Sequence, residues 1–269
     1  MPATGRVLVF DSGLGGLTVL REIARARADV DLFFVADDAA FPYGRLEDQP
    51  LIDRVVAVMD RFIAELRPSL VVIACNTAST LALPVLRARF PIPFVGTVPA
   101  IKPACAQSKT KRISVLATPG TVRRDYTRDL IEKFAGECRV TLVGGEMLAS
   151  FAEAALRGEA IDEAEIRREL APCFVDDAGR TDTVVLACTH YPLILDRLEP
   201  LAPWPVTWID PAPAIARRAS QLLGPEQPRK GRPSQAFFTS ESVASPILMT
   251  ALSSFGVEIG TTGPVKLSV

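Results

Sequence analysis

The sequence predicts an α/β fold built from two pseudo-symmetric, doubly wound domains with mainly parallel sheets. Three observations lead to this prediction. Short β-branched apolar runs alternate with longer amphipathic segments, a pattern typical of parallel strands covered by helices. One pattern, an apolar strand that runs into a cysteine and two polar residues, occurs twice. The length of 269 residues suits two domains of medium size.

Each predicted strand is a short apolar run that is followed by a turn or a helix-like segment. The strands are expected at Arg6–Phe10, Asp31–Ala36, Leu70–Ala74, Phe94–Gly96, Ile113–Ala117, Arg139–Val143, Thr183–Ala187 and Val206–Ile209.

The predicted helices carry apolar residues on one stripe, as Leu17, Leu20 and Ile23 do in the first of them. Pro68 lies just past the end of the second, where a proline commonly follows a helix. The polar segment 224–233, rich in proline and glycine, is expected to be a surface loop. The helices are expected at Leu17–Ala28, Leu51–Leu66, Ala78–Phe90, Thr121–Phe134, Ile161–Val175, Leu193–Leu198 and Ser240–Phe255.

The internal repeat predicts the domain organisation. Leu70–Thr77 reads LVVIACNT and Thr183–His190 reads TVVLACTH, with the two cysteines 113 positions apart (188 − 75). Two related domains explain this repeat, each with a thiol at the carboxyl end of a strand, where open α/β sheets bind ligands. Proline-rich connections place the crossovers near residues 97 and 208. We therefore expect a first domain from residues 1–97 plus 208–269 and a second from 98–207.

The composition excludes several classes of protein. A formal net charge of −1 with 23% charged residues is ordinary for a globular protein and argues against a nucleic-acid surface. No apolar stretch has the roughly 20 residues that a membrane-spanning helix needs, and Met1–Asp11 carries no export signal. Five cysteines without a C-x-x-C pair indicate free thiols in a reducing cytoplasm. A single histidine, His190, is too few for a typical catalytic zinc site, so no metal is expected.

Cys75 and Cys188 are the candidate chemical groups. A cysteine that ends a buried strand is usually a small apolar residue, but here both strands also deliver hydrogen-bonding side chains, and the second delivers His190. A Cys188–His190 pair is typical of a thiol hydrolase. In that reaction Cys75 would have no role. Two thiols across a small pocket suit a different reaction. One removes a proton from a carbon and the other supplies a proton to the opposite face, which inverts a stereocentre.

The other cysteines have no such context and are expected to be structural. They are Cys105, Cys138 and Cys173.

Three further loops follow predicted strands. Asp11–Gly16 is either a tight strand–helix turn with a capping side chain or a small anion pocket with Asp11 as a functional carboxylate. Asp37–Gly44 is either a loop with capping aspartates or a donor site for a carboxylate ligand, through the Tyr43 hydroxyl and a backbone N–H. Thr118 either caps the helix that follows or binds a ligand.

Taken together, Val9–Leu20, Pro42–Gly44, Ala74–Ser79 and Cys188–Leu193 resemble the glutamate racemases of the aspartate/glutamate racemase superfamily. The resemblance covers most of residues 6–218. It implies two α/β domains related by pseudo-twofold symmetry, with the active site in the cleft between them. It also implies interconversion of L- and D-glutamate, which supplies D-glutamate for peptidoglycan synthesis. The expected partner is thus a small-molecule substrate, neither nucleic acid nor membrane, and the sequence leaves a homodimer open.

The resemblance also implies roles for individual residues. Cys75 and Cys188 correspond to the two catalytic acid/base thiols, and Glu153 to an acidic residue near the second thiol. Asp11 is expected to assist Cys75, and His190 or Glu153 to assist Cys188. The residues expected to bind the substrate are Asp11, Ser12, Tyr43, Gly44, Asn76, Thr77, Thr118, Thr121, Thr189 and His190.

Two chemical expectations accompany these roles. The helix N-termini that follow both strands, with His190 beside Cys188, are expected to lower the thiol pKa values. Pyridoxal phosphate, the usual electron sink for this reaction, binds through a lysine. None of the lysines lies in a recognisable cofactor motif, so no cofactor is expected.

The chain departs from the family pattern in two places. Asp37-Asp38 stands where the family commonly has a single aspartate before Thr-Ala, and Thr97–Lys102 replaces a common Val-Ile-Glu-Pro segment. Three alternatives stay open at this point: a racemase for aspartate or hydantoins, a Cys188–His190 hydrolase, and a non-catalytic module that binds an anion at the sheet edge.

Overall fold

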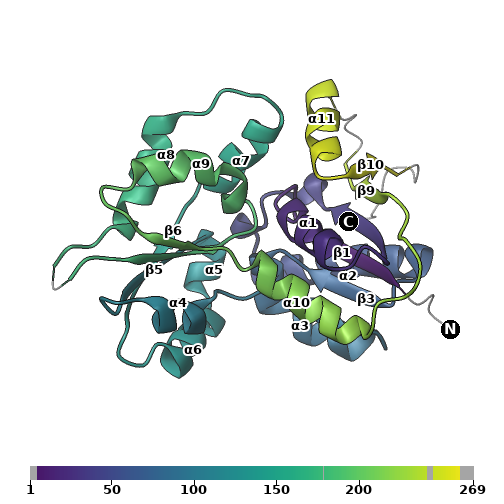
Figure 1. Ribbon diagram of the computed structural model, residues 1–269, viewed down its shortest axis with the longest axis horizontal. Coiled ribbons are helices and arrows are strands. Elements are labelled where there is room, and N and C mark those ends of the chain that lie inside the picture. The colour runs from purple at the N-terminus through teal and green to yellow at the C-terminus, as the bar shows by residue number, and fades with distance from the viewer. Residues whose placement is uncertain (1–4, 178, 241–244, 261–269) are drawn as a thin grey trace.

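Two parallel sheets, one in each half of the molecule, form the framework of the protein (Figure 1). The computed structural model describes residues 5–177, 179–240 and 245–260. Within these residues the larger sheet has the strand order β10-β9-β2-β1-β3-β4 and the smaller sheet the order β6-β5-β7-β8. Neighbouring strands pair in parallel throughout both sheets. The order β2-β1-β3-β4 therefore recurs as β6-β5-β7-β8, which confirms the predicted α/β fold with two related sheets.

The predicted strands all form, and their ends lie within one residue of the predicted ones. The larger sheet also contains β9 and β10, which were not predicted as strands because β9 is a short run in a polar segment and β10 has three residues, two of them exposed. The strands are β1 (Arg6–Asp11), β2 (Asp31–Ala36), β3 (Leu70–Ile73), β4 (Phe94–Gly96), β5 (Arg112–Ala117), β6 (Arg139–Gly144), β7 (Thr183–Ala187), β8 (Thr207–Ile209), β9 (Ser234–Phe238) and β10 (Val257–Ile259).

Helices cover both faces of each sheet. They are α1 (Leu17–Ala26), α2 (Asp48–Leu66), α3 (Asn76–Arg89), α4 (Ile101–Gln107), α5 (Pro119–Arg123), α6 (Asp125–Phe134), α7 (Leu148–Leu156), α8 (Glu163–Leu170), α9 (Leu195–Leu198), α10 (Ala212–Leu223) and α11 (Pro246–Ser254).

The predicted helix at Thr121–Phe134 is divided in the structure. Arg124 separates α5 from α6 in an extended conformation, with φ −79° and ψ 140°. Its guanidinium turns inward and donates to the carbonyl of Thr77 at 3.0 Å. The hydroxyl of Thr127 donates to the carbonyl of Thr121 at 2.7 Å, which satisfies a backbone acceptor at the break.

Three other predicted helices are shorter than expected. Asp162 caps α8 by accepting from the N–H of Ala164 at 2.9 Å, so the helix begins there rather than at Ile161. The predicted segment Leu193–Leu198 is largely a 3₁₀ turn that leads into α9. Helix α11 begins at Pro246, and residues 241–244 of that predicted helix lie outside the described residues.

The apolar core lies on both faces of each sheet. In β1, Val7 and Leu8 point to opposite faces and belong to two different apolar clusters, and both are 0% exposed. In β7, Val184 and Val185 are divided in the same way. Strands buried on both faces need apolar residues at successive positions, which explains why they read as continuous apolar runs.

After β8 the chain returns to the first half of the molecule. Helix α10 lies beside α1 (Figure 1), and Ile215 and Ala219 share an apolar cluster with Leu20 and Ile23. Strand β8 belongs to the smaller sheet up to Ile209. The domain boundaries near residues 97 and 208 stay a prediction.

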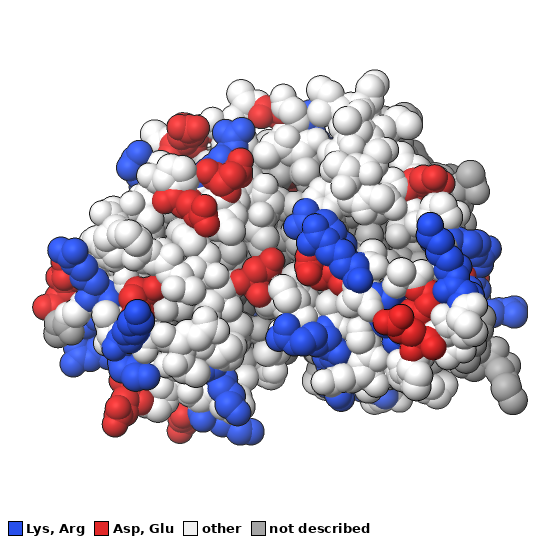
Figure 2. Space-filling view, viewed as in Figure 1, with Lys and Arg blue, Asp and Glu red and all other residues white. Residues whose placement is uncertain are grey.

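The surface carries mixed charge. On the face drawn in Figure 2, acidic and basic side chains are interspersed, as the net charge of −1 suggests. No described helix combines the length and the apolar character that crossing a membrane requires.

The strand order creates a crevice at the carboxyl edge of each sheet. From β1 the chain moves to β2 on one side, and it then crosses to β3 on the other, so the loops after β1 and β3 diverge. Asp11 ends β1 and Cys75 follows β3. Thr118 and Cys188 occupy the equivalent positions after β5 and β7 in the smaller sheet.

Candidate active site

Cys75 lies at the N-terminus of α3, directly after β3. Its Sγ accepts a hydrogen bond from the N–H of Ala78 at 3.5 Å and contacts the Ser12 hydroxyl at 3.6 Å. Burial, with a smaller effect of the Asp11 charge, raises the pKa of Cys75 to about 12. We expected the helix N-terminus to lower this pKa, but the pKa is raised overall. The Ala78 hydrogen bond does act downward, but the loss of solvation outweighs it.

Asp11 is buried beside Cys75 and reaches across to the other half of the molecule. Its Oδ2 accepts from the N–H of Gly16 at 2.8 Å and from the hydroxyl of Thr189 at 3.2 Å. Burial raises the pKa of Asp11 above its usual value, although His190 acts in the opposite direction. Asp11 therefore acts on Cys75 through its charge, while its hydrogen bonds tie the loop after β1 to the loop after β7.

Cys188, His190 and Glu153 form a chain of contacts in the smaller half. The Nδ1 of His190 lies 3.8 Å from the Sγ of Cys188, and its Nε2 lies 2.9 Å from the Oε1 of Glu153. Burial alone would lower the pKa of His190, but hydrogen bonds to Cys188 and Glu153 outweigh it and raise this pKa well above its usual value. Burial opposes ionisation of Glu153, yet the hydrogen bond from His190 and its charge lower the net pKa of Glu153. Both shifts favour an imidazolium that faces a carboxylate.

The loop Asp11–Gly16 packs against this chain, which explains its glycines. The N–H of Leu14 donates to Glu153 Oε1 at 2.5 Å, and the N–H of Gly15 lies 3.2 Å from Nε2 of His190. A Cβ on Gly13 would lie 2.3 Å from Glu153 Oε1, and one on Gly15 would lie 2.5 Å from His190 Nδ1. The loop therefore does bind an anion, and that anion is a carboxylate from the other half of the protein.

Three hydroxyl groups meet where the two halves touch. Thr77 Oγ1 lies 2.9 Å from Thr118 Oγ1 and 3.3 Å from Thr121 Oγ1, and Thr118 and Thr121 lie 3.1 Å apart. Thr118 also caps α5 by accepting from the N–H of Thr121 at 3.3 Å. Next to them, Asn76 is 2% exposed, and neither polar atom of its amide has a partner among the described residues. Such a buried amide is expected to bind a ligand.

Tyr43 and Gly44 approach this group from the loop before α2. The Tyr43 hydroxyl donates to Asp37 Oδ2 at 2.5 Å, so it already has an acceptor, and the backbone is the part of this pair that faces the threonines. A Cβ on Gly44 would lie 3.1 Å from the Cβ of Thr118, and one on Gly120 would lie 3.1 Å from the carbonyl of Gly44. Gly44 thus forms the wall that meets the second half of the molecule.

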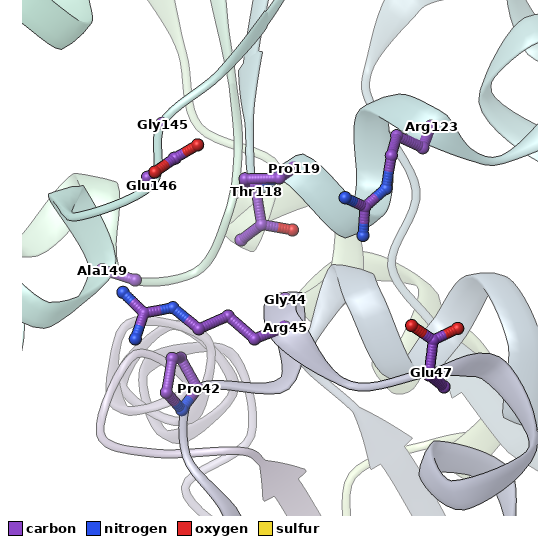
Figure 3. Close-up of a pocket in the computed structure, with 10 residues that line it drawn as sticks. All are labelled: Pro42, Gly44, Arg45, Glu47, Thr118, Pro119, Arg123, Gly145, Glu146 and Ala149. Atoms are coloured by element: carbon purple, nitrogen blue, oxygen red, sulfur yellow. The ribbon is translucent and has the colours of Figure 1, made fainter.

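A pocket of about 290 Å³ opens beside this wall (Figure 3). Gly44 and Thr118 line it, and the guanidinium groups of Arg45 and Arg123 point into the space around them. Neither thiol lines this pocket, and Cys75 and Cys188 are each 5% exposed. The pocket therefore does not include the thiols, and it shares Thr118 with the group of three hydroxyls.

The predicted site residues lie near one another where the two halves meet. The three cysteines that were expected to be structural lie away from this site. Cys105 and Cys173 are buried in the apolar clusters of the smaller half, and Cys138 packs against the same core. Among the described residues no group of His, Cys, Asp and Glu is placed to hold a metal ion.

Sequence reasoning missed several residues that support the site. Arg54 and Thr239 bind Asp37, Arg124 donates to Thr77, and the ring of Phe41 lies 5.3 Å from that of His190. Their partners are distant in the sequence, so no local pattern could have revealed them, although Phe41 directly precedes the Pro-Tyr-Gly motif.

The fold agrees with the comparisons to known proteins. Residues 10–219 match the Asp/Glu/hydantoin racemase family. The chain therefore belongs to this family of racemases.

Within the family, the chain belongs with the glutamate racemases. A glutamate racemase from Brucella canis is 55% identical over 239 residues, which are 87% of this chain and 86% of that protein. The structure of Escherichia coli glutamate racemase in complex with L-glutamate and the activator UDP-MurNAc-Ala has a TM-score of 0.88 and 39% identity. It covers 96% of this chain and 97% of that one. The glutamate racemase isoform RacE1 from Bacillus anthracis has a TM-score of 0.81 and 25% identity, with 99% and 100% covered.

Proposed function

We propose that this protein interconverts L- and D-glutamate without a cofactor, using Cys75 and Cys188 on opposite faces of the substrate. One observation carries the proposal. The two thiols follow equivalent strands of two related sheets, and the loop after β1 reaches both: Ser12 contacts Cys75 at 3.6 Å, and the N–H of Gly15 lies 3.2 Å from the imidazole that contacts Cys188. The glutamate racemases similar to this chain, one of them solved with L-glutamate, support glutamate as the substrate.

In the proposed reaction, a thiolate on one side takes the α-proton. The C–H bond breaks, an S–H bond forms, and the electron pair stays on the substrate, spread over its carboxylate. The opposite thiol then gives its proton to the other face of the carbon and becomes a thiolate. The sulfurs have exchanged their protonation states, so the next reaction runs in the reverse sense.

The proposed carboxylate site consists of the hydroxyls of Thr77, Thr118 and Thr121 with the amide of Asn76. These groups are buried and already held in place by one another. Donors fixed in a water-poor site stabilise a developing negative charge more strongly than water does. They are thus suited to the carbanion, whose charge is shared with the carboxylate.

The environment of Cys75 sets an energetic requirement. With a pKa of about 12, forming its thiolate at pH 7 costs roughly 7 kcal/mol. The α-ammonium group of a bound amino acid brings a positive charge into this buried site, which favours the thiolate. We therefore propose that the substrate itself activates Cys75, whereas His190, whose Nδ1 lies 3.8 Å from Cys188, is the side chain placed to assist the second thiol.

Four finer points belong to the same proposal. The protein supplies D-glutamate for peptidoglycan synthesis and works in the cytoplasm, as the free thiols suggest. Its domains comprise residues 1–97 with 208–269, and 98–207. The packing of α10 on α1 supports this division. A homodimer stays a prediction.

Circular dichroism of glutamate tests the proposed function. Purified protein should bring L-glutamate and D-glutamate to the same zero signal, with L-aspartate and a hydantoin converted far more slowly. Equal or faster conversion of either competitor would assign the protein to another racemase of the family. A covalent acyl-enzyme in mass spectra would favour the hydrolase. Glutamate binding with no loss of optical activity would favour a binding module.

A further inference from the structure

Asp37 is a fully buried carboxylate in the loop between β2 and α2, and its role is not explained by the proposed chemistry. Oδ2 accepts from the Tyr43 hydroxyl at 2.5 Å and from Arg54 Nε at 2.8 Å. Oδ1 accepts from Arg54 Nη2 at 2.5 Å and from the Thr239 hydroxyl at 2.6 Å. A carboxylate has about four sites for acceptance. All of them are occupied, so Asp37 cannot also bind a substrate.

These hydrogen bonds join three elements of the larger half. Tyr43 belongs to the loop that carries Gly44, Arg54 lies on α2, and Thr239 directly follows β9. The neighbouring Asp38 strengthens the last connection, because its Oδ1 accepts from the N–H groups of Thr239 at 3.0 Å and of Ser240 at 2.9 Å. The acidic pair therefore fixes the loop to a strand about 200 residues away in the sequence.

The loop in turn sets one wall of the candidate active site. Tyr43 is 1% exposed, and Gly44, the next residue, meets Thr118 and Gly120 across the boundary between the halves. Burial and the nearby Asp37 carboxylate raise the pKa of Tyr43 well above its usual value, so the hydroxyl remains a donor at any physiological pH. A shift of the Tyr43 ring would move Gly44 relative to the threonine hydroxyls.

We infer that Asp37 is a positioning residue, which holds the Tyr43–Gly44 backbone at the distance from Thr118 that glutamate binding requires. It acts through the Tyr43 hydroxyl and is itself fixed by Arg54 and Thr239. The inference rests on the proposed function, because it concerns the same site.

The chain offers a matched control for this carboxylate. Asp29 is also buried, and it pairs with Arg27 through two hydrogen bonds of 2.8 Å each. It precedes β2, at the edge of the sheet opposite to the candidate site, whereas Asp37 follows β2. Asp29→Asn and Asp37→Asn therefore disrupt similar ion pairs, and only one of them lies next to the loop.

The test compares Asp37→Asn, Tyr43→Phe, the double variant and Asp29→Asn. The readouts are the melting temperature, the Kd for D-glutamate by calorimetry, and KM and kcat in both directions. We expect both substitutions at the loop to raise Kd and KM about tenfold, with kcat changed less than threefold. The double variant should have Kd and KM values no higher than those of the worse single variant, because both changes break the same connection. Asp29→Asn should lower the melting temperature and leave Kd and KM within twofold of wild type.

Two results would overturn the inference. In the first, Asp37→Asn and Tyr43→Phe lower the melting temperature as Asp29→Asn does but leave Kd and KM unchanged, which makes Asp37 merely structural. In the second, the two effects multiply in the double variant, which means that Asp37 does not act through Tyr43. Tyr43→Phe removes one oxygen only, so it decides the question even if Asp37→Asn fails to fold. Wild-type protein that binds glutamate without racemising it would defeat the proposed function, while the Kd comparison would still decide the role of Asp37.

Discussion

The Nε2 of His190 lies 2.9 Å from the Oε1 of Glu153, and both side chains are buried at the boundary between the two halves. The raised pKa of His190 and the lowered pKa of Glu153 make this contact an ion pair. The same imidazole lies 3.8 Å from Cys188 through its other nitrogen. One imidazole thus contributes to the packing of the two halves and also contacts a candidate catalytic thiol.

The ion pair predicts a pH window for stability. Since the folded pKa of His190 is raised, its contribution is full below its ordinary value of 6.5 and is lost as the pH rises through the folded value. Since the folded pKa of Glu153 is lowered, its contribution is full above 4.5 and is lost as the pH falls through the folded value. Glu153→Gln should cost about 1–3 kcal/mol of unfolding free energy between these two pH values, and less on either side. Urea unfolding at a series of pH values measures this cost, and a cost that does not vary with pH would argue against the ion pair.

Asp11→Asn should impair turnover, although it keeps the size of the side chain. We expect kcat to fall about 100-fold in both directions, within the range of acid/base effects, because an amide holds the N–H of Gly16 and the Thr189 hydroxyl less firmly than the carboxylate does. Asp60→Asn, which breaks an exposed pair with Arg89, is the control and should leave kcat unchanged. Steady-state rates for L- and D-glutamate are the measurement. Unchanged turnover of Asp11→Asn in both directions would refute a role for this carboxylate.

Gly15→Ala tests the contact between the glycine loop and His190. The added Cβ would lie 2.5 Å from His190 Nδ1 and 2.7 Å from the backbone nitrogen of the same residue, so the backbone has to move. We expect a loss of stability of about 1–3 kcal/mol and a clear drop in kcat/KM. Gly144→Ala, whose Cβ would meet its nearest atom at 3.3 Å, should be much milder. Equal melting temperatures and rates for the two variants would show that the halves do not pack as described.

Arg45 and Arg123 line the pocket beside Gly44 and Thr118 (Figure 3), and we propose that a substrate with two carboxylates enters there. Replacing both by alanine should lower kcat/KM about three- to tenfold at low ionic strength. The loss should shrink at high salt, since steering by exposed charges is screened. Arg25→Ala on α1 removes an exposed arginine elsewhere and serves as the control. A loss that persists unchanged in high salt would indicate direct binding rather than steering.

Much of the fold could be predicted from the sequence, because the strands are buried on both faces and are therefore continuously apolar. Runs such as Leu70–Ile73 are apolar at every position, and the repeat around Cys75 and Cys188 follows from the recurring strand order. Helix α7, which carries Glu153, was harder to see, because its alanine-rich sequence has a weak amphipathic pattern. Strand β10 is too short and too exposed to leave a pattern.

The electrostatics and the supporting contacts of the site could not be predicted in the same way. The pKa of Cys75 depends on how completely the folded protein excludes water, which the helix N-terminus alone does not determine. Asp37 was visible only as a loop aspartate. Its partner Thr239 is 202 positions away, and only the folded sheet brings β9 next to β2.

Solvent deuterium exchange tests the two-thiol reaction most directly. Wild type, Cys75→Ser and Cys188→Ser are incubated with each glutamate enantiomer in D₂O, and NMR follows the α-proton while circular dichroism follows the configuration. We predict that wild type forms the opposite enantiomer with deuterium at the α-carbon, and that each serine variant loses racemisation by at least about 100-fold. Racemisation at the wild-type rate by either variant would rule out the two-thiol reaction, because one sulfur would then suffice.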